Sequence, residues 1–193
     1  MIQQAEAAAP VDAGLIHWRI STERYLQLAR DGVFEEDRVE LINGNIISMT
    51  PPNPPHNHCQ ILLTNRLRPD EATGLLAVEV TVHIADGHVY QPDVVLLKPG
   101  RDYRTRYPVA DDLLLVVETA NSSIRKDRGP KLRAYAAAGV ADYWIADVQR
   151  GVLITHREPR EDSYRIVEER RGDDRVSPLR LPEYGLRVGD LFE

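Results

Sequence analysis

Short apolar runs alternate with polar residues along this chain, and their spacing predicts the elements of its secondary structure. Between residues 21 and 32 the apolar positions recur at helical spacing, with Ser21 able to cap the helix and Gly32 able to stop it. Residues 38–49 form two β-rich runs around an Asn-Gly pair, which is the strongest short signal for a hairpin. A rigid, Pro-rich connection at residues 51–57 then leads to a second helix.

The rest of the chain is richer in strands, with a helix between them. β-rich runs occupy residues 75–84, 90–97, 113–120, 142–148, 151–158 and 163–170. The helix is expected from Asp127, a capping residue, through Pro130 in its first turn, to Gly139 at its C-terminal end. Because no repeat or linker breaks this order, the sequence predicts one α/β domain over residues 15–193, a mixed sheet flanked by helices, after a flexible tail at residues 1–14.

The composition is that of a soluble globular protein. A length of 193 residues suffices for a substantial core, and apolar and charged contents of 42% and 28% are ordinary for that class. No apolar run is long enough to cross a bilayer, and no apolar segment follows a basic N-terminus, so no membrane partner is expected. Cys59 is the only cysteine, so an internal disulfide cannot form and the reducing cytoplasm is the predicted location.

The distribution of charge changes this picture locally. A net charge of -6 argues against a protein that binds nucleic acid over its whole surface. Residues 98–106 nevertheless hold four basic residues against one acid, and residues 125–133 hold five against one. The two segments bracket Glu118 and predict a local site for phosphates, although solvated loop charges are the simpler explanation. Tyr103 and Tyr107 interleave with the first segment and could stack on bases. The candidate nucleic-acid contacts are Arg101, Arg104, Arg106, Arg125, Lys126 and Arg128.

Three acids occupy unusual places in the predicted strands. Asp93 opens one strand, Glu118 ends the next, and Glu40 interrupts the first hairpin. If the strands of Asp93 and Glu118 pair, their carboxylates meet, and the following helix brings Lys131 beside them. Paired carboxylates are ligands of Mg²⁺, usually with water and substrate phosphate completing the shell. The lysine would then orient the attacking water and steady the charge that develops on the phosphorus oxygens.

These residues stand in segments that resemble a known family. The stretches "PDVVLL" and "LVVETANSSIRKDRGPKLRAYAAAGVADYWIAD", with "VELINGNII" and "PPNPPHN" before them and "GLRVGDLF" at the end, resemble the Uma-type restriction endonuclease family of the PD-(D/E)XK phosphodiesterase superfamily. The resemblance covers roughly residues 20–192. It implies a restriction-endonuclease-like fold and an endonuclease that uses Mg²⁺ or Mn²⁺ to hydrolyse phosphodiester bonds, in DNA.

The resemblance also implies roles for individual residues. Asp93 and Glu118 match the family's metal-binding acids, and Glu40 matches a further carboxylate near the metal. Ala120 stands where the superfamily pattern has its lysine, and the family supplies this lysine from the next helix, at the position of Lys131. His56 matches a residue near the active site and is expected to contact the substrate. The chain departs from the family pattern at Asn43, Asn45 and Asn121, which bears on contacts around the metal.

Other interpretations stay open. The chain could bind nucleic acid or a protein partner without catalysis, because a fold does not fix a function. In a purely structural interpretation, Asp127 and Lys131 form a helical i, i+4 pair and Glu118 bonds a backbone amide. Cleavage of both strands of a duplex needs two active sites or two visits, so a homodimer is expected. Potential zinc ligands also occur, without a Cys-x-x-Cys pair, at His56, His58, Cys59, His83 and His88.

Overall fold

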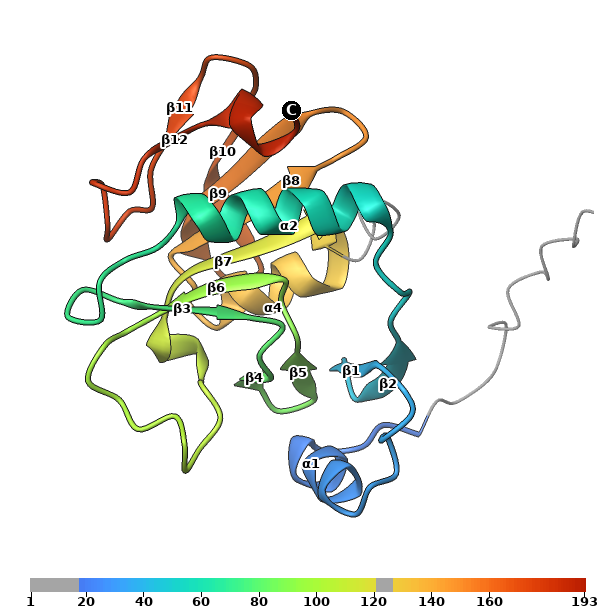
Figure 1. Ribbon diagram of the computed structural model, residues 1–193. Helices are drawn as coiled ribbons and strands as arrows, with labels where there is room; N and C mark the ends of the chain where they lie inside the picture. The colour runs from blue at the N-terminus through green and yellow to red at the C-terminus, as the bar shows by residue number, and fades with distance from the viewer. Residues whose placement is uncertain (1–17, 121–126) are drawn as a thin grey trace, which may run out of the picture.

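The main element of the fold is a six-stranded sheet with the strand order β10-β9-β8-β7-β6-β3 (Figure 1). The computed structural model describes residues 18–120 and 127–193. The strands of this sheet are β3 (Leu75–Val78), β6 (Val94–Leu97), β7 (Leu113–Ala120), β8 (Asp142–Asp147), β9 (Val152–Arg160) and β10 (Ser163–Arg170). Strands β7 and β8 are parallel, whereas the other neighbours are antiparallel. The expectation of a mixed sheet flanked by helices is therefore confirmed.

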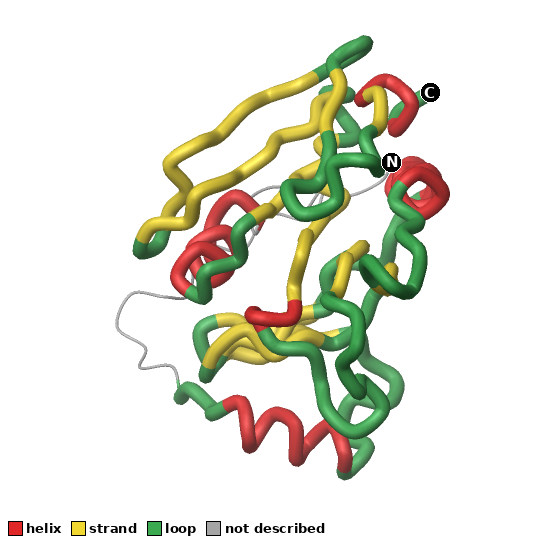
Figure 2. The backbone as a smooth tube through the Cα atoms, turned by 90° about the vertical axis from the view of Figure 1, so that its left-hand side faces the viewer, coloured by secondary structure: helices red, strands yellow, loops and turns green. Residues whose placement is uncertain are grey.

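Helices cover both faces of this sheet. Helix α2 (Pro54–Arg66) lies over β6 and β7 on one face, and α4 (Leu132–Ala137) lies against β9 and β10 on the other. Figure 2 shows the two helices on opposite sides of the strands. Side chains alternate across a strand, so Val94 and Val117 are buried with the α2 residues Cys59 and Leu63, while their neighbours Val95 and Val116 are buried with Tyr135 of α4.

A second, four-stranded sheet lies between the main sheet and helix α1 (Thr22–Arg30) (Figure 1). Its order is β2-β1-β5-β4, and its bounds are Val39–Ile42 for β1, Asn45–Ser48 for β2, Val82–Ala85 for β4 and His88–Tyr90 for β5. Helix α1 packs on it through Tyr25, which is buried with Leu41 and Val89. The capping residue predicted for this helix is confirmed, since the side chain of Ser21 accepts a hydrogen bond from the amide of Arg24.

Two runs that the sequence predicts as single strands are divided between the sheets. Residues 75–84 form β3 in the main sheet and β4 in the smaller sheet, separated at Glu79, whose φ is 50°. The predicted strand at residues 90–97 is likewise divided, since Tyr90 ends β5 and β6 begins only at Val94. The prediction of unbroken strands was wrong because β propensity reports a fit to a pleated surface and does not say which strand will be the partner.

The two predicted helices of the site begin elsewhere than expected. Helix α2 starts inside the Pro-rich segment, because prolines fit the first turn after the cap Asn53. Before α4, residues 127–131 form a π-helical turn, labelled η2 (Asp127–Lys131), that is interrupted at Gly129. Regular α-helix therefore begins only after Lys131, and Gly139, with a φ of 77°, ends it as predicted.

The C-terminal segment adds small elements that the sequence does not predict. Strands β11 (Arg175–Val176) and β12 (Leu186–Arg187) pair with each other, and the 3-10 helix η3 (Val188–Leu191) packs beside α2. A further 3-10 turn, η1 (Ala110–Asp112), precedes β7. Within residues 18–120 and 127–193, every helix is too short or too polar to cross a membrane. The tail predicted at residues 1–14 lies outside the described residues.

Candidate active site

Asp93 directly precedes β6, and Glu118 lies on the neighbouring strand β7. The antiparallel register pairs Val94 with Val117, so Asp93, just before β6, and Glu118 each adjoin one member of this pair. The side chain of Glu118 lies on the face that α4 covers, where it contacts Tyr135, whereas that of Asp93 contacts His56 of α2. The amide of Thr119 donates to Asp93 Oδ2 at 2.6 Å. Both acids are nearly buried, with relative exposures of 8% and 4%. The strands pair, which is the condition that the sequence set for bringing these acids together, and the charge of Asp93 acts on Glu118.

Lys131 joins the second sheet to this pair. Its Nζ lies 2.9 Å from Glu40 Oε1 and 3.0 Å from Glu118 Oε1, and its side chain is only 4% exposed. Glu40 comes from β1, and its Oε1 also accepts a hydrogen bond of 2.9 Å from the amide of Gln91. Lys131 itself is the last residue of the π-helical turn η2. The structure thus brings Glu40, Asp93, Glu118 and Lys131 together from separate parts of the chain.

Two tyrosines complete the surroundings of the lysine, and the sequence analysis did not assign them to the site. The hydroxyl of Tyr135 donates to Glu118 Oε1 at 3.1 Å, and the ring of Tyr90 lies 5.5 Å from the Nζ of Lys131. Such a contact between an ammonium group and an aromatic face is favourable. A signal for Tyr135 does exist in the sequence, because a residue four positions after Lys131 shares its helical face.

Helix α2 contributes His56 to the site. The Nε2 of His56 lies 3.2 Å from Asp93 Oδ1, and Gln60 on the same helix donates to the backbone carbonyl of Asp93 at 3.0 Å. Burial acts to lower the pKa of His56, but the hydrogen bond and charge of Asp93, together with the charge of Glu79, outweigh it and raise that pKa. The Nδ1 of His56 is buried and has no hydrogen-bond partner among the described residues.

The site holds more negative than positive groups in a buried space. Burial raises the pKa of Glu118 well above its usual value, with Asp127, Asp93 and Glu40 adding to the effect and Lys131 opposing it. Burial alone would lower the pKa of Lys131, but Glu118, Glu40 and Asp127 raise it well above its usual value. The lysine is therefore held as a cation. The excess of carboxylates makes the site attractive to a further positive charge.

The donor set fits a hard divalent cation held through carboxylates, water and phosphate. Among the described residues, no three His, Cys, Asp or Glu side chains gather closely enough to hold a metal ion by themselves. Mg²⁺ is commonly bound by one or two carboxylates with waters and a substrate phosphate, so Asp93 and Glu118 satisfy that requirement. Both hydrogen bonds that Glu118 accepts from Lys131 and Tyr135 go to Oε1, on one side of its carboxylate.

The alternative zinc set does not assemble in the part of the chain that the structure describes. Cys59 is 1% exposed in the core under α2, and burial raises the pKa of its thiol to about 12, which disfavours the thiolate that zinc binds. The ring of His58 turns away toward the backbone oxygen of Glu193, at 3.3 Å. His88 contacts the hydroxyl of Tyr90, at 2.5 Å.

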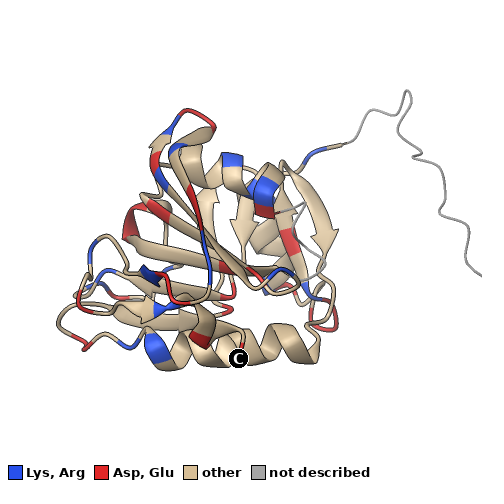
Figure 3. Ribbon diagram, turned by 90° about the horizontal axis from the view of Figure 1, so that it is seen from above, with Lys and Arg blue, Asp and Glu red and all other residues tan. Residues whose placement is uncertain are grey.

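The predicted phosphate contacts are mostly engaged in ion pairs. Arg106 binds Asp112 through two hydrogen bonds of 2.6 and 3.0 Å, and Arg101 lies 3.7 Å from the same carboxylate. Arg104 pairs with Asp102 but remains 90% exposed, and Arg128 lies 3.4 Å from Glu169. Figure 3 shows Lys and Arg (blue) interspersed with Asp and Glu (red) over the molecule. Arg125 and Lys126, also predicted as contacts, lie outside the described residues.

A mixed sheet with one acid just before β6 and another on the neighbouring β7, and with a lysine from the following helical turn bound to the second acid, defines a restriction-endonuclease-like protein. The chain belongs to the Uma2 family, whose description is "Putative restriction endonuclease" and whose model matches residues 22–189. The resemblance noted in the sequence is thereby confirmed.

A solved structure shares the fold. The crystal structure of "a putative nuclease belonging to DUF820" from Anabaena variabilis ATCC 29413 matches with a TM-score of 0.71. The match covers 90% of this chain and 97% of that chain, at 18% sequence identity. No curated protein matches the chain.

Proposed function

We propose that this protein is an endonuclease that hydrolyses phosphodiester bonds in DNA with the help of a divalent cation, Mg²⁺ or Mn²⁺. One observation carries the proposal: Asp93 accepts a hydrogen bond from the amide of Thr119, next to Glu118 on β7, and the Nζ of Lys131 lies 3.0 Å from Glu118 Oε1. Membership of a family described as "Putative restriction endonuclease" supports the same class of reaction.

Asp93 and Glu118 would hold the cation. When bound, such a cation lowers the pKa of a coordinated water and neutralises charge on the phosphate. His56 Nε2 and the amide of Thr119 donate to the two oxygens of Asp93, at 3.2 and 2.6 Å, and so fix the orientation of that carboxylate. Tyr135 does the same for Glu118. We therefore propose His56 as a positioning residue for Asp93, in addition to its predicted contact with the substrate.

Lys131 acts as a hydrogen-bond donor and fixed positive charge. Its raised pKa keeps Nζ protonated, so this atom cannot accept the proton of the attacking water. An ammonium group has three donors, and two of them bond Glu40 and Glu118, which leaves one for the attacking water or a phosphate oxygen. Glu40 would thus serve the reaction by holding Lys131 in place, and its predicted contact with the metal would be additional.

The remaining expectations stay predictions. A homodimer would supply two active sites for the two strands of a duplex. The free, buried thiol of Cys59 is compatible with the predicted cytoplasmic location. Of the proposed phosphate contacts in the described residues, Arg104 is the most exposed and is the strongest candidate.

The test is cleavage of supercoiled plasmid by the purified protein in Mg²⁺ or Mn²⁺, beside Asp93→Ala and Lys131→Ala. We expect nicking or linearisation by the wild type alone, with a metal-induced rise in melting temperature that Asp93→Ala lacks. Absence of both cleavage and thermal response in the wild type would exclude this mechanism and favour a protein that binds nucleic acid or a partner without cutting. Equal activity in all three proteins would indicate a contaminant or a different site.

A further inference from the structure

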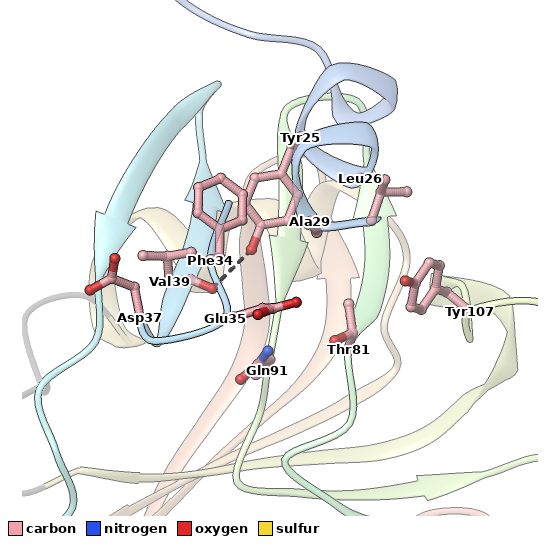
Figure 4. Close-up of a pocket in the computed structure, with 10 residues that line it drawn as sticks. All are labelled: Tyr25, Leu26, Ala29, Phe34, Glu35, Asp37, Val39, Thr81, Gln91 and Tyr107. Carbon is pink, nitrogen blue, oxygen red and sulfur yellow. Dashed lines mark hydrogen bonds between the residues drawn. The ribbon is translucent and has the colours of Figure 1, made fainter. Parts of the chain in front are cut away.

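A pocket opens beside the candidate active site, between α1, the segment that leads into β1, and the loop before η1 (Figure 4). It encloses about 190 Å³, which is below the roughly 300–1,000 Å³ of pockets for drug-sized ligands and suits a single ring system. Two of its lining residues adjoin Glu40 directly. Val39 precedes Glu40, and the amide of Gln91 donates to Glu40 Oε1 at 2.9 Å.

One side of the pocket is aromatic. Tyr25 and Phe34 stack on each other, with ring centroids 5.4 Å apart and planes inclined by 26°. Tyr25 is tied down, because its hydroxyl donates to the carbonyl of Val39 at 2.9 Å. Tyr107 lines the pocket from the basic loop, and this residue is 41% exposed. The other tyrosine of this loop, Tyr103, is engaged with Lys98 and Arg106, so Tyr107 alone of the two is free to stack on a ligand.

The other side of the pocket carries polar side chains. Figure 4 shows Glu35, Thr81 and Gln91 near one another below the stacked rings. Glu35 forms no ion pair with any described residue, and the side chains of Thr81 and Gln91 form no hydrogen bond with the described part of the chain. A carboxylate only accepts hydrogen bonds at neutral pH, whereas the amide of Gln91 and the hydroxyl of Thr81 can donate.

We propose that this pocket binds an unpaired guanine base of the nucleic acid that is cleaved, an inference that rests on the proposed function. The Watson–Crick edge of guanine offers two adjacent donors, N1–H and the N2 amino group, beside the acceptor O6. The donors match the two oxygens of the Glu35 carboxylate, and O6 matches the amide of Gln91 or the hydroxyl of Thr81. Cytosine and adenine present a single amino group next to an acceptor nitrogen, which a carboxylate repels. Tyr107 would cover the plane of the base.

Occupation of the pocket requires the Watson–Crick edge of the base to be free. The substrate is therefore single-stranded at this position, or the base leaves the stack when the protein binds. Because Gln91 stands two residues before Asp93, a base held here belongs to a nucleotide close to the bond that is cleaved. The proposal thus assigns both a base preference and a strand preference to the site.

The test measures binding of short fluorescent oligothymidines that carry one central guanine, inosine, adenine or cytosine, by anisotropy, with wild-type protein in EDTA. Inosine lacks only the N2 amino group of guanine, so the guanine–inosine pair isolates the contact with the carboxylate. We expect guanine to bind about tenfold more tightly than inosine, as a bidentate base contact does. Glu35→Gln should remove this preference, and Glu36→Gln, an exposed neighbour that does not line the pocket, should retain it. Pairing the same guanine in a hairpin stem should weaken binding.

Equal binding of all four oligonucleotides, or an unchanged guanine preference in Glu35→Gln, would overturn the proposal. Both results are separable from the proposed function by metal-dependent cleavage of the same oligonucleotides. Cleavage without a guanine preference would leave the endonuclease intact and reject the pocket. A guanine preference without cleavage in any metal would keep the pocket and reject the endonuclease.

Discussion

The Nζ of Lys131 lies 2.9 Å from Oε1 of Glu40. Strand β1 of the smaller sheet therefore holds the lysine that follows β7 of the main sheet in the chain. The same ammonium group binds Glu118 at 3.0 Å, and all three side chains are almost fully buried. One cation therefore compensates two buried carboxylates, and the geometry of the site depends on it.

Removal of the lysine's charge should destabilise the fold. In Lys131→Met, Glu40 and Glu118 remain buried without their partner, and breaking a buried ion pair costs about 3–5 kcal/mol. Urea denaturation measures this loss as a lower midpoint. The matched control is Arg133→Met on the exposed side of α4, which should change stability by no more than about 0.5 kcal/mol. Addition of Glu40→Gln to Lys131→Met should restore part of the loss, and equal stability of Lys131→Met and wild type would contradict this account of the site.

Loss of either carboxylate should abolish the response to metal. Asp93→Asn and Glu118→Gln keep the shape of the side chains but remove the charge that a hard divalent cation requires. Mutation of residues that only hydrogen-bond a metal ligand lowers metal affinity or activity by about 10–100-fold. Loss of the ligand itself should therefore lower the cleavage rate by more than about a hundredfold. Titration with Mn²⁺ in a thermal-shift experiment should raise the melting temperature of wild type and of the exposed-acid control Asp162→Asn, but not that of either site variant. Retention of the shift in Asp93→Asn would place the metal elsewhere.

Loss of Arg104 should weaken nucleic-acid binding, whereas loss of Arg106 should lower stability. Arg104 is 90% exposed, and Arg104→Ala should weaken nucleic-acid binding and lower the slope of log K against log salt by about 1. Arg106 instead bonds the buried carboxylate of Asp112 at 2.6 and 3.0 Å, so Arg106→Ala should lower stability. Binding isotherms at several salt concentrations, with urea midpoints for both variants, decide between these roles. The reverse pattern would mean that the ion pair opens when nucleic acid binds.

His156 should make the protein sensitive to mild acid. Burial lowers the pKa of this residue from 6.5 to about 4, so the folded state resists its protonation. Its contribution to stability is fully present above about pH 6.5, where the unfolded state is also neutral, and is lost as the pH falls toward about 4. The loss amounts to about 3 kcal/mol across this range.

The measurement for His156 is the urea-unfolding free energy of wild type and His156→Asn between about pH 7 and pH 4. The difference in unfolding free energy between the two proteins isolates the effect of His156, because the other titrating groups are the same in both. One of them is His56, whose raised pKa makes its contribution to stability change with pH in the opposite direction. We expect the two curves to converge as the pH falls. Parallel curves would show that His156 is protonated in the folded protein without cost.

Much of the local structure follows from the sequence alone. The cap at Ser21, the Asn-Gly turn between β1 and β2, and the stop at Gly139 each depend on residues next to them in the chain, so local rules suffice. The nearly continuous apolar runs of β7 and β8 likewise place these strands in the core. Family motifs then indicate which acids and which lysine to consider.

Tertiary structure decided how these parts combine. Nothing local indicates that the run of residues 75–84 divides between two sheets, because each half is stabilised by pairing with a strand distant in sequence. For the same reason, the sequence could name Glu40 as a site residue but could not show that it binds Lys131, since that contact exists only once the smaller sheet closes on the main one. The pairing of Arg106 with Asp112 and the pocket lined by Glu35, Gln91 and Tyr107 also arise from segments that meet only in the folded chain. The sequence by itself thus determined the elements and the chemical groups, and long-range packing determined their partners, because burial and charge compensation depend on neighbours in space.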